Sequence, residues 1–247
     1  MSMISHQGDV LPKRVPLAHR DRVDWHDHAD HQLISPRHGV LRISTPSGVW
    51  VVPSHRAVWV PAGVAHAHEA HGRTEMQCLV FDPSINPLRL DRPTVLAVTP
   101  LLREVLAALT GDEDFTGEQR HNLERVLLDQ LRRVEAVRVW LPSPSDPRLR
   151  GIAAILTADP ADDRTLARFG SVVGASERTL SRLFRAETGM SFPQWRAQLR
   201  LHHSFTLLAS GAPVTSVAAA CGYSGPSAFI QAFKHAFGMT PGDYART

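Results

Sequence analysis

Histidine is concentrated near the beginning of the chain, where ten of the fourteen histidines lie within the first 71 residues. The segment WHDHADHQL, residues 25–33, places metal-binding or hydrogen-bonding side chains at every second position: His26, His28, Asp30 and Gln32. In an extended strand these side chains would share one face. The later segment PAGVAHAH adds His66 and His68. Neutral imidazole is a common metal ligand, so we expect these residues to bind a metal ion or a polar small molecule.

A repeat occupies the last third of the chain. Residues 169–195, FGSVVGASERTLSRLFRAETGMSFPQW, are similar to residues 214–246, VTSVAAACGYSGPSAFIQAFKHAFGMTPGDYAR. The offset is 48 residues between Gly174 and Gly222 and 49 residues at the later matching positions. Two copies are too few for a solenoid, so the repeat indicates a pair of small modules that perform one structural task twice.

Each copy has the pattern of a helix, a tight turn and a second helix. Ser176 is a candidate N-cap for a second helix through about Glu187, and Ser224 is a candidate N-cap for one from about Pro226 to Ala236. A helix-turn-helix of this kind places its second helix in the major groove of DNA. For a single copy, a helical hairpin used only for packing would be the favoured interpretation, and the repetition favours DNA binding.

The C-terminal residues resemble the signature of AraC/XylS-type transcription regulators over about residues 150–247. The matching positions, in order and spacing, are Val217, Ala218, Gly222, Tyr223, Ser227, Phe229, Phe233, Lys234, Gly238, Thr240, Pro241, Tyr244 and Arg246. The resemblance implies two helix-turn-helix units that bind double-stranded DNA, joined by a long helix expected at Pro193–Ser210. Gly170 departs from the pattern, which usually has Ala, and we expect it to loosen its helix by up to about 1 kcal/mol.

The outward side chains of the two second helices are the candidate DNA contacts. Leu180, Phe184, Phe229 and Phe233 define the inward faces. The outward candidates are Arg178, Thr179 and Arg182 in the first copy, and Ser227, Gln231 and Lys234 in the second. Arginine can bind O6 and N7 of guanine together and glutamine suits adenine, whereas lysine more often neutralises a phosphate.

The histidine segments resemble the two motifs of cupin barrels, through the pattern H-x-H-x3-Q followed by P-x-G-x2-H. In that family two histidines, a carboxylate and a later histidine converge on a divalent metal. The resemblance implies a site for Zn, Fe, Ni or Mn at His26, His28, Gln32 and His66. Gln32 departs from the pattern, because a neutral amide is a weaker ligand than a carboxylate. The alternative is a polar pocket for an organic ligand, with His31 and His68 as further candidates.

The elements that must position these residues can be read from hydrophobic periodicity. Short apolar runs between about Val15 and Phe81 predict six or more strands, and thus a small antiparallel barrel or sandwich. From Pro100 the period becomes helical and predicts two helices that extend to about Val137. Their apolar stripe either covers the barrel or forms a dimer seam.

The predicted fold class is α+β, with four segments. Residues 1–99 form an antiparallel, cupin-like β-barrel that serves as a sensor, and residues 100–140 form a helical dimerisation segment. The proline-rich residues 141–147 are expected to be an extended linker. Residues 148–247 form an all-α domain with two helix-turn-helix units.

Composition limits the classes of protein to consider. The chain has 247 residues, of which 43% are hydrophobic and 21% charged, as in a globular protein. Residues 1–145 carry a net charge of −1 and residues 146–247 a net charge of +4, which fits nucleic-acid binding by the second part. Cys78 and Cys221 lie in different halves and predict no disulfide framework. The sequence shows neither a signal peptide nor an apolar run of about 18 residues, so we expect a cytoplasmic protein without a membrane span.

These observations predict a ligand-responsive, sequence-specific transcription regulator that is not an enzyme. The resemblance implies activation more often than repression, through contact with RNA polymerase. We also expect a small-molecule effector and a homodimer. The alternative is a metal-dependent cupin enzyme, of the dioxygenase or isomerase class, fused to a DNA-binding domain, for which Asp30 and Glu69 are the nearby acids. An architectural DNA protein is disfavoured, because no run of Lys and Arg provides a broad basic surface.

Overall fold

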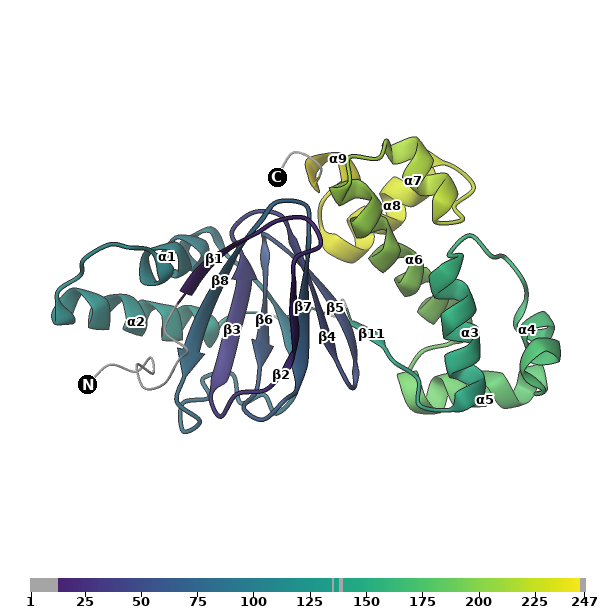
Figure 1. Ribbon diagram of the computed structural model, residues 1–247, viewed down its shortest axis with the longest axis horizontal. Coiled ribbons are helices and arrows are strands. Elements are labelled where there is room, and N and C mark those ends of the chain that lie inside the picture. Colours follow the sequence, from purple (N-terminus) through teal and green to yellow (C-terminus); the bar gives the residue numbers. More distant parts are fainter. Residues whose placement is uncertain (1–12, 135, 138–139, 245–247) are drawn as a thin grey trace. The chain divides into compact units, whose positions relative to one another are not determined.

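The computed structural model describes residues 13–134, 136–137 and 140–244 (Figure 1). The N-terminal residues 1–12 and Arg246, which belongs to the C-terminal signature, lie outside this range. The chain divides into two compact units: residues 1–45 with 50–138, and residues 46–49 with 139–247. In the described part of the chain, no helix is both long enough and apolar enough to cross a bilayer.

The first unit is built from short antiparallel strands. They are β1 (Lys13–Leu17), β2 (Arg22–His26), β3 (His31–Pro36), β4 (Val40–Thr45), β5 (Gly48–Pro53), β6 (Arg56–Val60), β7 (His66–His71), β8 (Thr74–Phe81), β9 (Thr94–Ala97) and β10 (Ala136–Val137). One sheet has the order β1-β8-β3-β6-β9-β10, and the other contains β5-β4-β7-β2. The predicted antiparallel fold with six or more strands is confirmed.

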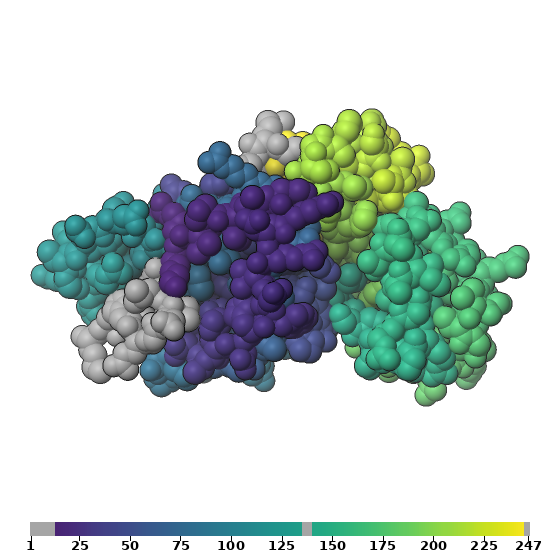
Figure 2. Space-filling view, in the orientation of Figure 1, coloured from purple at the N-terminus to yellow at the C-terminus, as the bar shows by residue number. Residues whose placement is uncertain are grey.

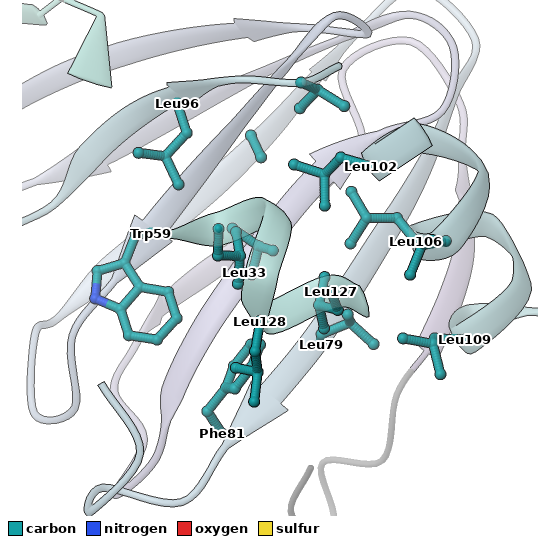
Figure 3. Close-up of a cluster of buried hydrophobic side chains, with 14 residues drawn as sticks. Leu33, Trp59, Leu79, Phe81, Leu96, Leu102, Leu106, Leu109, Leu127 and Leu128 are labelled. Carbon is teal, nitrogen blue, oxygen red and sulfur yellow. The ribbon is translucent and has the colours of Figure 1, made fainter. Parts of the chain in front are cut away.

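Two helices cover the outer face of the six-stranded sheet. They are α1 (Pro100–Thr110), with Thr99 as its N-cap, and α2 (Gly117–Leu131), which begins with a capping box between Thr116 and Gln119. The buried cluster shown in Figure 3 combines residues from both helices with residues from the strands: Leu33, Trp59, Leu79, Phe81, Leu102, Leu106, Leu127 and Leu128. The apolar stripe of α2 therefore covers the sheet, while Val126 remains 37% exposed.

The helical segment ends earlier than the sequence predicts. Helix α2 stops at Leu131, and Ala136–Val137 form β10, which pairs with Leu96 and Val95 of β9. The prediction of a helix through Val137 is wrong at these residues. Val137 is β-branched and suits a strand, and β9 offers its free edge for backbone hydrogen bonds.

The second unit is helical, apart from one short strand. Its elements are β11 (Trp140–Pro142), α3 (Pro147–Ala158), α4 (Leu166–Val173), α5 (Glu177–Thr188), α6 (Phe192–Ala209), α7 (Val214–Ala220), α8 (Pro226–Phe237) and α9 (Pro241–Tyr244). The proline-rich segment is attached to this unit. The indole nitrogen of Trp195 donates to the carbonyl of Pro142 at 2.9 Å, and Glu187 accepts from the backbone N–H groups of Ser145 and Asp146.

Within the helical unit, α4–α5 form the first helix-turn-helix unit and α7–α8 form the second, and α6 joins them. This arrangement confirms the predicted fold of this part of the chain. Figures 1 and 2 show the two units as separate lobes, green for α3 to α5 and yellow-green to yellow for α7 to α9. Trp195 and Leu199 of α6 belong to the core of the first lobe. Phe205 of α6 packs in the second, where its ring centroid is 5.0 Å from that of Phe233 and 4.5 Å from that of Phe237.

The turns of the two units have the same backbone conformation. Gly174 and Gly222 have φ values of 68° and 69°, in the left-handed region that glycine adopts without strain. The residue after each glycine donates its N–H five positions back, from Ala175 to the carbonyl of Gly170 at 3.0 Å and from Tyr223 to the carbonyl of Ala218 at 2.9 Å. The repeat in sequence is thus a repeat in structure.

The change of offset from 48 to 49 residues has a local explanation. Ser176 caps α5 by accepting from the N–H of Thr179, as predicted. In the second helix-turn-helix unit the N-cap of α8 is Gly225, which corresponds to Ser176 at the offset of 49, so Ser224 is an extra residue of the turn and the prediction that it caps this helix is wrong. Pro226 follows as the first helical residue and excludes the helical conformation just before it, which the extended Gly225 satisfies.

Gly170 lies close to the backbone of the turn, so the residue type at this position matters for the turn as well as for the helix propensity of α4. A Cβ atom at Gly170 would lie 2.3 Å from the carbonyl oxygen of Ala175. The backbone of the turn therefore passes directly over this position. In the second helix-turn-helix unit the equivalent residue is Ala218, which is buried.

We predict that Gly170→Ala lowers the thermal midpoint of the protein, because the added methyl group displaces the turn. Gly151→Ala is the matched control. Gly151 also lies in a helix, but a Cβ atom there would be 3.5 Å from Val173, an ordinary contact. The control should gain up to about 1 kcal/mol from helix propensity. Circular dichroism melts compare the two variants, and equal stabilisation by both substitutions would contradict the turn argument.

Candidate nucleic-acid interface and histidine cluster

Helices α5 and α8 each bury one face and expose the other. Leu180, Phe184 and Thr188 are buried in α5, and Phe229, Phe233 and Phe237 are buried in α8. The six candidate DNA contacts all lie away from these faces. Arg178, Arg182, Ser227, Gln231 and Lys234 are exposed, and Thr179 is half-buried. The hydroxyl of Thr179 lies 2.9 Å from that of Ser176, which ties it to the N-cap.

The exposed faces of α5 and α8 have equivalent positions. With the offset of 49 residues, Arg178 corresponds to Ser227, Arg182 to Gln231, and Arg185 to Lys234. These positions follow the spacing i, i+4, i+7, which forms one stripe along a helix. Arg185 is exposed and was missed by the sequence-based candidates. The repeat itself identifies it, because Arg185 aligns with Lys234.

The basic side chains of these stripes differ from other arginines of the second unit. Arg148 and Arg164 form ion pairs with Asp146 and Asp162. A hydrogen bond from Arg148 lowers the pKa of Asp146 to about 2. Among the described residues, Arg178, Arg182, Arg185 and Lys234 have no such carboxylate partner. Their charges are therefore available to an anion such as the DNA backbone.

The histidine cluster lies between the two sheets of the first unit. Strand β2 pairs with β7 so that His26 is opposite His66, with an irregular register between Val23 and His26. The ring centroid of His26 is 4.4 Å from that of His66, 4.9 Å from that of His28 and 5.4 Å from that of His68. Gln32 reaches this group from β3 of the other sheet, with its side-chain oxygen placed 3.2 Å from Nε2 of His66.

The predicted residues meet in space, although the segment that holds them is not one strand. Strand β2 ends at His26 and β3 begins at His31, in the other sheet. His26, His28, Gln32 and His66 still come together because β7 and β3 face each other. His31 has a different role: its Nδ1 accepts from the N–H of Ala62, and its Nε2 lies 3.2 Å from the carbonyl of Pro83.

Burial keeps His66 neutral. Mainly because of burial, its pKa falls to about 4, with further lowering by His26 and His28. Nδ1 lies 2.8 Å from the carbonyl of Val64, which only accepts, so Nδ1 carries the hydrogen of the neutral ring. Nε2 then offers a lone pair. With this tautomer, a hydrogen bond between Gln32 and Nε2 requires the amide NH2 group of Gln32, rather than its oxygen, to face His66.

His68 is the most strongly buried member of the group. It is 5% exposed, and neither of its ring nitrogens has a hydrogen-bond partner among the residues that the structure describes. Burial is the main cause that lowers its pKa to about 3, with the nearby His66 next. The candidate ligand atoms of His26, His66 and His68 all lie within 4.8 Å of one another. Alternation along β7 is the sequence signal for His68, because residues 66 and 68 share a face of the strand.

Most of the chain is similar in sequence to known proteins. Residues 170–247 match the family described as a helix-turn-helix domain. The HTH-type transcriptional regulator NimR of Escherichia coli K12 is 35% identical over 227 residues, which cover 89% of this chain and 81% of that protein. A putative AraC-like transcription regulator of Streptomyces antibioticus is 34% identical over 166 residues, covering 62% of this chain and 55% of that protein.

Among solved structures, a fatty-acid-bound ToxT from Vibrio cholerae aligns with 95% of this chain and 94% of that chain, at 14% identity and a TM-score of 0.42. A TM-score of this size does not establish a common arrangement of the whole chain. The identity to NimR extends over more than four-fifths of both proteins, and the two helix-turn-helix units agree with it. The chain therefore belongs to the AraC-type family of helix-turn-helix transcription regulators, and it is a DNA-binding regulator rather than an enzyme.

Proposed function

We propose that one chain reads two short DNA elements, one with α5 and one with α8, under the control of a ligand bound in the β-rich unit. One observation carries the DNA part: the same exposed i, i+4, i+7 stripe occurs on the second helix of both helix-turn-helix units. Arg182 and Gln231 occupy the middle positions and are suited to read bases. Arg185 and Lys234 are in the last turns, where they contact phosphates.

We further propose that the regulator acts in the cytoplasm as a homodimeric activator that contacts RNA polymerase. The family resemblance supports activation. Support for a dimer comes from α2, where Val126 stays exposed after the other apolar residues have packed on the sheet. A Val126→Glu substitution should then shift the sedimentation of the protein from dimer to monomer, and an unchanged mass would remove α2 as the seam.

Replacing Arg182 with Ala should weaken binding to the preferred DNA by about 1 to 3 kcal/mol and relax the preference at one base pair, as expected for the loss of a bidentate contact to guanine. The preferred duplex is first selected from a randomised pool with the unaltered protein. Selection is then repeated with the variant. If the selected sequences are unchanged, Arg182 does not read a base.

Replacing Lys234 or Arg185 with Ala should weaken binding to all duplexes alike, because a phosphate contact carries no sequence information. Each substitution should also reduce the slope of log K against log salt by roughly one unit. Fluorescence anisotropy at several salt concentrations measures this slope. A loss confined to the selected sequence would show that the side chain reads a base instead.

The histidine cluster is proposed as the ligand site, and its donor set fits a divalent metal such as Zn, Fe, Ni or Mn. His26 and His66 direct their Nδ1 atoms to the carbonyls of Asp24 and Val64, which leaves the Nε2 atoms available as ligands. His68 adds a buried ring without a hydrogen-bond partner. A bound ion would supply a positive centre that anchors an effector oxygen. Without an ion, the same nitrogen atoms can hydrogen-bond an organic effector.

Replacing His26 or His66 with Ala should abolish the response to effector while DNA affinity stays within about twofold, because both residues lie in the first unit. Metal content of the purified protein and thermal shifts with Zn, Fe, Ni and Mn salts test the metal directly. His38→Ala, outside the cluster, is the control. Stoichiometric metal in both variants would exclude these residues as ligands, and a normal effector response in both would exclude the cluster as the sensor.

A further inference from the structure

The two helix-turn-helix units have separate cores, and α6 passes through both. Trp195 and Leu199 belong to the first core, and Phe205 to the second. Between these positions lies Arg200, one residue after the last contact with the first core. It is half-buried and forms no ion pair with a carboxylate in the described part of the chain. Its guanidinium group instead binds backbone carbonyls from both units.

Arg200 donates three hydrogen bonds. Nε donates to the carbonyl of Pro160 at 2.8 Å, and Nη2 donates to that of Asp162 at 3.4 Å. Both acceptors lie in the loop that precedes α4, in the first helix-turn-helix unit. Nη1 donates to the carbonyl of Gly222 at 2.9 Å, in the turn of the second helix-turn-helix unit. One planar, rigid group therefore connects the loop of one unit with the turn of the other.

The contact leaves no room for a side chain at Gly222. A Cβ atom there would lie 2.6 Å from Nη2 of Arg200 and 2.9 Å from the Cα atom of Ala161. The turn of the second helix-turn-helix unit therefore lies directly against the loop that precedes α4 in the first. Gly222 meets two requirements at once, since its φ of 69° also favours glycine.

We propose that Arg200 is a positioning residue that fixes the distance and the rotation between α5 and α8, and so sets the spacing of the two DNA elements that the protein accepts. This inference rests on the proposed reading of two elements by one chain. Charge-assisted hydrogen bonds to carbonyls are stronger than neutral ones. Without them, the two units are held by α6 and by the packing of each unit against it, and small changes of angle become possible.

The test compares binding constants on a duplex selected from a randomised pool and on the same duplex with one base pair inserted between the elements. The unaltered protein should lose about tenfold or more on the altered duplex, because one base pair rotates the second element by about a tenth of a turn. Arg200→Ala should bind the selected duplex more weakly but lose no more than about threefold on the altered one. Arg200→Lys, which cannot donate to all three carbonyls in a plane, should lie between them.

Arg196→Ala is the matched control. Arg196 lies one turn earlier on α6. It donates to the carbonyl of Arg164 at 3.0 Å and packs over the ring of Phe192, so its contacts stay within the first helix-turn-helix unit. It should keep the spacing preference of the unaltered protein. A general loss of stability would affect both arginine variants, whereas loss of positioning affects only Arg200. Circular dichroism confirms folding, and if Arg200→Ala does not fold, Arg200→Lys is judged by the same comparison.

The outcomes separate this inference from the function on which it rests. A full spacing preference in folded Arg200→Ala, or in Arg200→Lys when Ala does not fold, would overturn the positioning role while leaving the two-element reading intact. An unaltered protein that binds both duplexes equally would contradict the two-element reading itself. A flattened preference in the Arg200 variants, together with a preserved one in Arg196→Ala, supports the inference.

Discussion

The second unit depends on a single continuous helix that serves two hydrophobic cores. Helix α6 has 18 residues, or roughly 27 Å of helix, and its aromatic residues anchor one lobe at each end: Trp195 in the first and Phe205 in the second. A helix of this length is stiff, so the lobes share one frame. Successive major grooves on one face of DNA are about 34 Å apart, a distance that two lobes mounted on such a helix can span.

The first unit places its polar chemistry in a different environment. The recognition stripes are exposed and carry the charged side chains Arg178, Arg182, Arg185 and Lys234. In contrast, His66 and His68 are buried and neutral because burial lowers their pKa values to about 4 and about 3. A buried polar group without a partner costs free energy, and both nitrogens of His68 are in this condition. A ligand that forms hydrogen bonds with these nitrogens would stabilise the folded β-rich unit. Ligand binding would thus change the free energy of unfolding of this unit.

Much of this organisation follows from local sequence rules, and the rest depends on tertiary contacts. The cap at Ser176, the glycine turns and the extent of α6 follow from local preferences, and the alternation of apolar residues predicts the strands. The sequence could not show that Gly170 lies under the carbonyl of Ala175, or that Arg200 joins Pro160 to Gly222, because those partners meet only in the folded chain. The same reason explains β10, whose pairing with β9 overrides the helical periodicity before it.

We propose that one chain presents two recognition helices to one face of DNA. Hydroxyl-radical footprinting on the selected duplex tests this proposal most directly. It compares the unaltered protein with a variant in which Gln231→Ala and Lys234→Ala together remove two side chains of the exposed stripe of α8. We expect two protected elements about one helical turn apart for the unaltered protein. The altered protein should lose protection at one element and keep it at the other. A single protected element for the unaltered protein, or the loss of both elements together in a folded variant, would contradict the reading of two elements by one chain.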